Sequence, residues 1–209
     1  HMSVEKFSAI FDGLKQAYGT YKVEKTQSNG KNTGKASIIK EPRTPKLWKG
    51  HLSGKGTSIG IIPINEDNCC KWGCIDVDQY PLDHKVLIEK IRAMKLPLVV
   101  CRWIEAKDMQ KVLTHLSAAL GYGGSEIFPK QVKLHLDRGD VGNFLNLPYY
   151  DAEDGLRYGI LDDGTSATLE EFFGLYEAHV QTPEEIVKLQ MTDAQVKGPL
   201  ADGPPCLQH

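Results

Sequence analysis

The sequence predicts a mixed α/β protein of the α+β type, with helices and short strands in one chain. Apolar residues recur at helical spacing in several segments, and short Ile- and Val-containing runs lie between turn-forming residues. Two capping boxes mark the starts of helices near the C-terminus. The 209 residues, without an internal repeat, are enough for one substantial domain or two closely packed lobes.

The first part of the chain predicts one helix and two strands. Apolar residues recur at helical spacing over residues 3–18. A Lys-rich stretch follows, and Pro42 and Pro45 end a short apolar run within it. Residues 58–64 and 72–78 are predicted strands.

The middle of the chain predicts a βαβ unit followed by a long helix. Asp83 can cap a helix, and residues 96–102 then return as a buried strand. The stretch 106–120 has the spacing of an amphipathic helix, and Gly121 stands where a left-handed C-cap is expected.

Two further helices are predicted near the C-terminus. Thr168 with Glu171 and Thr182 with Glu185 have the spacing of capping boxes. Pro183 stands at the first helical position of the second one, which favours a helix start.

Charge is unevenly distributed, although the formal net charge is only -2. Residues 15–55 contain ten Lys and Arg but two Glu, a local charge of +8. Such a stretch, with Gly30, Asn32 and Gly34 at its centre, suits a flexible loop lying along phosphates. A merely solvated surface is the alternative, and both interpretations stay open.

The composition is typical of an intracellular protein. The five cysteines do not resemble a secreted disulfide framework, so reduced thiols and a cytoplasmic location are expected. Cys70 and Cys74 could be two zinc ligands, but no second close pair accompanies them. No apolar run approaches the roughly 20 residues that span a bilayer, so no membrane partner is expected.

Two carboxylates are predicted on one face of a strand. Alternation over residues 72–78 places Asp76 and Asp78 on the same side. Their charges repel unless a cation lies between them, and Mg²⁺ and Mn²⁺ prefer such oxygen ligands. Such a pair can hold a triphosphate for in-line attack by a 3′-hydroxyl. Asp-x-Asp also arises often by chance near strand ends.

The residues around this pair resemble a known family. The run His51-Leu-Ser-Gly-Lys55, then Gly60 and Pro63, precedes the Asp76-Val-Asp78 strand. With the later segments 126–131, 142–149 and 203–208, this order resembles the archaeo-eukaryotic primase superfamily, in its phage- and plasmid-type primase-polymerase branch. The resemblance covers most of the chain from about residue 51.

The resemblance implies a primase-polymerase fold with a mixed central sheet. An RRM-like catalytic lobe would accompany a smaller N-terminal αβ lobe. Residues 3–200 would form the catalytic domain, divided into the N-terminal lobe (3–65), the catalytic sheet (66–165) and the C-terminal helices (168–196). Residues 198–209 would begin a linker to a C-terminal accessory or helicase domain.

The implied activity is that of a template-dependent DNA primase or DNA polymerase in phage or plasmid replication. Two Mg²⁺ or Mn²⁺ ions would be held by Asp76, Asp78 and a third carboxylate, which the resemblance places at Glu126. Asp137 and Asp140 are rival positions, although their surroundings predict a turn. The expected partners are a DNA template with its primer and nucleoside triphosphates, in the cytoplasm of a host cell.

Several further residues are candidates for contacts with nucleotide or DNA. The resemblance and their chemistry favour Lys55, Arg102, Lys130, Gln131 and Asn143, with Asn146 as an additional possibility. Asn143 and Asn146 could instead satisfy backbone groups in a turn.

One expected motif is absent. The family places a glycine-containing hairpin with a serine-x-histidine motif, which binds the triphosphate, where Arg102 here runs into Trp103. We therefore expect a segment to be missing between these residues, with Cα atoms much further apart than about 3.8 Å. Without that motif, a catalytically inactive single-stranded-DNA-binding module is the alternative. A metal-dependent nuclease or phosphoesterase is the third interpretation.

Overall fold

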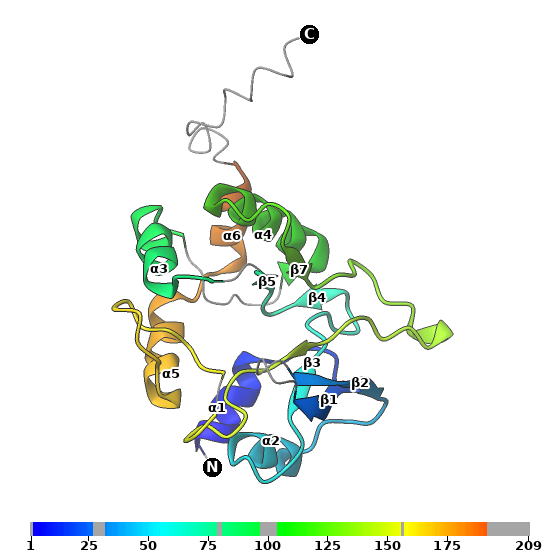
Figure 1. The fold of residues 1–209 in the computed structure, drawn as a ribbon. Coiled ribbons are helices and arrows are strands. Elements are labelled where there is room, and N and C mark those ends of the chain that lie inside the picture. Colours follow the sequence, from blue (N-terminus) through cyan, green and yellow to red (C-terminus); the bar gives the residue numbers. More distant parts are fainter. Residues whose placement is uncertain (1, 27–31, 79–80, 97–103, 156, 192–209) are drawn as a thin grey trace.

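The fold confirms the predicted mixed α+β class. The computed structural model describes residues 2–26, 32–78, 81–96, 104–155 and 157–191. They contain six α-helices, one 3-10 helix, a four-stranded sheet and two separate two-stranded ribbons. Figure 1 shows α4 and α6 at one end, the four-stranded sheet with α1 and α2 at the other, and the ribbon of β5 and β7 between them. No helix in these ranges is both long and apolar enough to cross a membrane.

The four-stranded sheet has the order β2-β1-β3-β8. Its strands are β1 (Tyr18–Thr26), β2 (Asn32–Ile39), β3 (Ile59–Ile61) and β8 (Leu145–Asn146). The two ribbons pair β4 (Cys69–Cys70) with β6 (Ile104–Glu105), and β5 (Cys74–Asp76) with β7 (Glu126–Phe128).

All these strand pairs are antiparallel. In the predicted mixed sheet, residues 96–102 form a parallel strand, the second strand of the βαβ unit. Residues 97–103 lie outside the described residues, so the βαβ unit stays a prediction.

Two clusters of buried side chains lie on opposite faces of the four-stranded sheet. The first, here the α4 core, joins α4, α6 and the turn before β1; it includes Leu14, Ile62, Val112, Leu116 and Ile186. The second, here the α1 core, joins α1, α2 and α5; it includes Phe7, Trp48, Ile59, Tyr149 and Phe173. Ile59 and Ile61 of β3 both belong to the α1 core, whereas Gly60 between them faces Phe144 of the α4 core, as the pleat of a strand requires.

The first helix is shorter than the 3–18 that the sequence predicts. It runs over α1 (Met2–Ile10) and ends where the chain must approach another strand. A Cβ on Gly13 would lie 2.1 Å from the carbonyl oxygen of Ile62. The Leu14 N–H donates to that same oxygen at 3.0 Å. A tertiary contact therefore ends the helix.

Where the structure describes it, much of the basic stretch is paired or helical and not a loop, whereas residues 27–31, which include Gly30, lie outside the described residues. Its described residues form the hairpin of β1 and β2 and then α2 (Pro45–Leu52). Pro45 opens that helix, with the Thr44 side chain accepting a hydrogen bond from the Leu47 N–H. Proline suits the first helical turn because its missing N–H has no partner there.

The remaining predicted helices are confirmed with their caps. The Asp83 carboxylate accepts from the Val86 N–H at 3.1 Å and begins α3 (His84–Ala93). Gly121, with φ 88°, ends α4 (Ala106–Leu120). Both capping boxes form, at the starts of α5 (Leu169–His179) and α6 (Pro183–Met191).

Candidate functional site

The ribbon of β5 and β7 brings together carboxylates that are far apart in the sequence. Its register pairs Asp76 with Glu126, Ile75 with Ile127, and Cys74 with Phe128. Directly opposite residues in an antiparallel pair have Cα atoms about 4.5–5.5 Å apart. The ribbon thus places Glu126, the expected third carboxylate, across from Asp76.

These carboxylates face away from α4. Ile75 and Ile127 pack against the α4 core, which fixes one face of the ribbon. Because successive side chains alternate between faces, Asp76 and Glu126 project from the other face. That face is turned toward the four-stranded sheet, which lies on the other side of the ribbon from α4 (Figure 1). The predicted alternation is confirmed for Cys74, Ile75 and Asp76, whereas Asp78 lies beyond the end of β5.

The charges at this site act on one another. The pKa of Asp76 is raised by its partial burial and then by the negative charges of Asp78 and Glu126. The positive charges of Lys130 and Arg157 act in the opposite direction. Ionised Asp76 is therefore repelled by its neighbours, and a cation at this place would relieve the repulsion.

The thiol of Cys74 lies beneath the same carboxylate. Burial, followed by the charge of Asp76, raises the pKa of Cys74 to about 12. The thiol consequently stays protonated at neutral pH, which makes it a poor metal ligand or nucleophile. Zinc binding through Cys70 and Cys74 has no support, since Cys70 is fully buried and packs in the α4 core.

Lys130 supplies a cation to the site. Its ammonium group lies 2.8 Å from the Glu126 carboxylate and 5.1 Å from the centre of the Phe128 ring. Both partners of the ion pair are partly open to solvent. An exposed pair of this kind contributes about 0–1 kcal/mol, so another anion or cation can compete for either partner.

Gln131 and Asn143 bind each other. The Asn143 N–H donates to the Gln131 side-chain oxygen at 3.1 Å, and the Gln131 amide donates to the Asn143 side-chain oxygen. Gly142 adopts φ 77° beside them, where a Cβ would approach that Gln131 oxygen to 3.0 Å. The two amides thus connect the segment after β7 with the entry to β8. A nucleotide contact by either one stays a prediction.

The rival carboxylates serve a turn, as their sequence context indicated. The Asp140 carboxylate accepts from the Gly142 N–H at 3.0 Å. Asp137 lies in the 3-10 helix Leu136–Arg138, which ends at Gly139 with φ 76°. Neither residue is among the charges that act on Asp76.

One of the predicted contact residues, Lys55, lies away from the ribbon. The loop after α2, which contains Lys55, lies at the lower end of the molecule in Figure 1, whereas β5 and β7 lie above its middle. Arg102, and the expected break between Arg102 and Trp103, lie outside the described residues.

Asn146 lies on β8 opposite Gly60. Its side-chain oxygen is buried and has no hydrogen-bond partner within the described ranges. Within these ranges, this oxygen therefore accepts no hydrogen bond from a backbone N–H, which was one of the two roles predicted for Asn146.

Arg157 is the functional candidate that sequence reasoning missed. It follows the segment after β8, where the Tyr149 N–H donates to the Arg157 carbonyl oxygen at 2.7 Å. The positive charge of Arg157 acts to lower the pKa of Asp76, although the Arg157 side chain is exposed. A single Arg outside any motif carries no local signal, and only the path of the chain places it there.

The donor set fits Mg²⁺ or Mn²⁺ in kind, since it consists of carboxylate oxygens that repel one another. Among the residues that the structure describes, however, no three His, Cys, Asp or Glu side chains are grouped closely enough to hold an ion. Binding would therefore require the carboxylates to turn toward each other, with Lys130 leaving Glu126.

No family model matches this chain, and the comparison with curated proteins found no match either.

Proposed function

We propose that this chain is the catalytic domain of a template-dependent DNA primase or DNA polymerase of phage or plasmid replication. Nucleotides from nucleoside triphosphates would be joined to a 3′-hydroxyl. The observation that carries the proposal is the position of Glu126 directly opposite Asp76, with Asp78 acting on the same group. The family resemblance from residue 51 onward supports the same activity.

Asp76, Asp78 and Glu126 would hold two Mg²⁺ or Mn²⁺ ions, which supply charge neutralisation and favour ionisation of the attacking hydroxyl when bound. Partial burial, followed by the charges of Asp78 and Glu126, raises the pKa of Asp76. The part due to these charges supports the assignment, because a cation site assembles charges that are unfavourable without the cation.

The basic groups beside the carboxylates would bind phosphates. Lys130 and Arg157 are both close enough to act on Asp76, and Lys130 is held only by an exposed ion pair. A triphosphate would compete with Glu126 for the Lys130 ammonium group, which frees Glu126 at the moment of nucleotide binding. Catalysis by such a site is chiefly positioning and charge stabilisation.

Primer extension by Asp76→Asn with Asp78→Asn tests the proposal. We expect synthesis to be lost while DNA binding survives, because the carboxylates hold ions and not template. A matched control replaces two exposed aspartates away from the ribbon, Asp137→Asn with Asp154→Asn, and should keep synthesis. Synthesis retained by the first variant would refute the assignment.

A catalytically inactive single-stranded-DNA-binding module is the second candidate. The ion pair between Lys130 and Glu126 favours it, because it neutralises one carboxylate without a metal. Titration of a labelled nucleoside triphosphate with Mn²⁺ separates the two candidates. Metal-dependent binding that Asp76→Asn abolishes supports the polymerase, whereas its absence supports the inactive module.

A further inference from the structure

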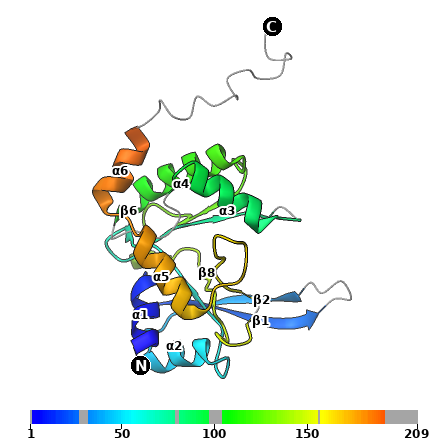
Figure 2. The ribbon, with the colours of Figure 1, turned by 90° about the vertical axis from the view of Figure 1, so that its left-hand side faces the viewer.

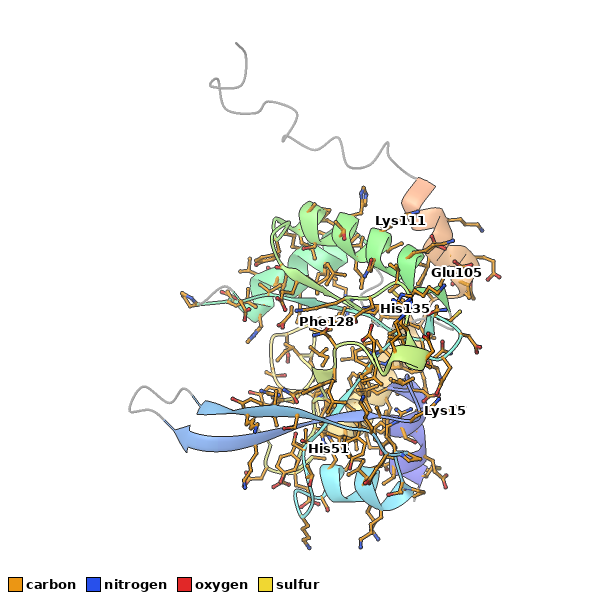
Figure 3. All side chains as sticks on the ribbon, turned by 90° about the vertical axis from the view of Figure 1, so that its right-hand side faces the viewer. Lys15, His51, Glu105, Lys111, Phe128 and His135 are labelled. Carbon is orange, nitrogen blue, oxygen red and sulfur yellow. The ribbon has the colours of Figure 1, made fainter. Side chains whose placement is uncertain are left out.

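The hairpin of β1 and β2 extends beyond the sheet to which it belongs. Only Gly19 and Thr20 of β1 pair with β3, so the outer part of β1 pairs with β2 alone. Figures 2 and 3 show this two-stranded arm projecting sideways from the rest of the fold. None of the residues of this outer part whose burial is described is buried: Tyr21, Lys22, Gly34, Lys35 and Ala36. The stability of the outer part therefore depends on interactions between its own two strands.

Two lysines face each other across this arm. The register places Lys22 directly opposite Lys35, and both side chains are exposed. Like charges at directly opposite positions destabilise a strand pair. Neither ammonium group has a carboxylate partner among the described side chains. Residues 18–40 as a whole contain five Lys and one Glu, so the arm is strongly basic.

Protection of the strand edges does not by itself require a directly opposite pair of like charges. Charged residues on an exposed edge, lysines above all, prevent pairing with other chains. An opposite-charge pair at the same two positions would protect the edge and stabilise the hairpin as well. The pairing of Lys22 with Lys35 therefore forgoes the stability of an opposite-charge pair, and an anionic partner beside both ammonium groups would relieve their repulsion.

The paired lysines lie on a definite face of the sheet. In β1, Lys22 shares a face with Thr20 and Tyr18, and Tyr18 packs against the α1 core. Gly19 lies on the opposite face, where it contacts Phe144 and the α4 core. Figure 3 accordingly shows His51 of the α1 side below the arm and Phe128 of β7 above it. The lysines thus project away from the carboxylates.

We propose that the β1–β2 arm binds duplex nucleic acid, with Lys22 and Lys35 each neutralising a backbone phosphate on the side turned away from Asp76. The inference rests on the proposed function only in taking nucleic acid as the partner. A two-stranded β-ribbon fits the major groove of a duplex. Single strands are usually bound by stacking on exposed aromatic rings. On this face, the next described residues toward the sheet are Thr20 and Ser37, which are not aromatic.

Binding of a labelled DNA duplex, without metal or triphosphate, tests the proposal. Each phosphate contact contributes about 0.9 to the slope of log affinity against log salt, so Lys22→Gln with Lys35→Gln should reduce the slope by about 1.8. At about 0.1 M salt this corresponds to roughly 60-fold weaker binding. The control Lys111→Gln with Lys188→Gln removes the same charge from exposed positions on α4 and α6 and should leave the slope unchanged.

A charge reversal distinguishes binding from a structural role. Lys22→Glu places a carboxylate opposite Lys35, so it should raise the midpoint of thermal unfolding while it weakens duplex binding further than Lys22→Gln does. A merely structural lysine would move both measurements in the same direction, and that result would overturn the proposal.

Three further outcomes would overturn it. They are an unchanged salt slope in the double variant, an equal loss in the control, and lysine-dependent binding of poly-glutamate without lysine-dependent binding of duplex. An equal loss for a single strand and for the duplex would overturn the choice of duplex. If neither the wild type nor any variant extends a primer, but duplex binding still depends on Lys22 and Lys35, the proposed function is refuted and this inference remains.

Discussion

His51 offers a quantitative test of how the lower part of the fold is held together. It is fully buried, and its ring joins two backbone segments. Nδ1 accepts from the Ile59 N–H at 3.1 Å, so Nε2 carries the proton and donates to the Pro148 carbonyl oxygen at 2.9 Å. The ring also stacks on Phe7, with centroids 5.9 Å apart.

Two replacements of His51 should distinguish the contributions of its two hydrogen bonds to the free energy of unfolding. His51→Leu leaves both backbone groups buried without partners, at about 1–3 kcal/mol each, so the free energy of unfolding should fall by about 2–6 kcal/mol. His51→Gln can still donate to Pro148 and should lose about 1–3 kcal/mol. Urea unfolding measures both, and His84→Leu, at the exposed start of α3, should change the value by less than about 0.5 kcal/mol.

The same histidine predicts a dependence of stability on pH. Burial lowers the pKa of His51 below its ordinary value, against a smaller opposite effect of the Pro148 carbonyl. The unfolded chain therefore binds a proton more readily than the folded one. Stability from this residue is fully present above about pH 6.5 and falls as the pH drops below that value.

The difference between the wild type and His51→Leu should consequently shrink below about pH 6.5, since the variant has no proton to bind there. Equal stability of the two proteins at pH 8, or a difference independent of pH, would refute the roles given to the ring nitrogens.

The other predictions concern the carboxylates, a glycine contact and a helix cap. Asp76→Asn should raise the free energy of unfolding at pH 7 by less than about 1 kcal/mol. The raised pKa of Asp76 means that its ionised form destabilises the folded protein at this pH, and the neutral amide removes that charge. A decrease in the free energy of unfolding would contradict this. Gly60→Ala places a Cβ 2.3 Å from the Phe144 ring and should cost about 1–3 kcal/mol in urea unfolding. Gly174→Ala, with open space inside α5, should instead stabilise by about 0.5–1 kcal/mol, and equal effects of the two would refute the contact. Thr168→Ala should lose about 1 kcal/mol of thermal stability, whereas no loss would show that the capping box is not formed in solution.

The carboxylate site was partly predictable. Alternation along one strand, a local property of the chain, predicted Asp76 and Asp78 on one face, and the structure confirms the alternation as far as Asp76, where β5 ends. Glu126 was expected from a family resemblance, and its position opposite Asp76 depends on the register of two strands joined through α3 and α4. Arg157 could not be predicted, because no short motif indicates which loop will approach a strand from a distant part of the chain.

By itself, the sequence determined the elements whose signals lie within a few residues: the cap at Asp83, the left-handed end at Gly121, both capping boxes and the α+β class. Their backbone groups are satisfied by near neighbours in the chain. Only the tertiary structure decided that the first helix ends at Ile10, where the following turn meets Ile62, and that the basic stretch becomes a paired arm. These outcomes depend on hydrogen bonds and close contacts between segments distant in sequence, which local propensity does not encode.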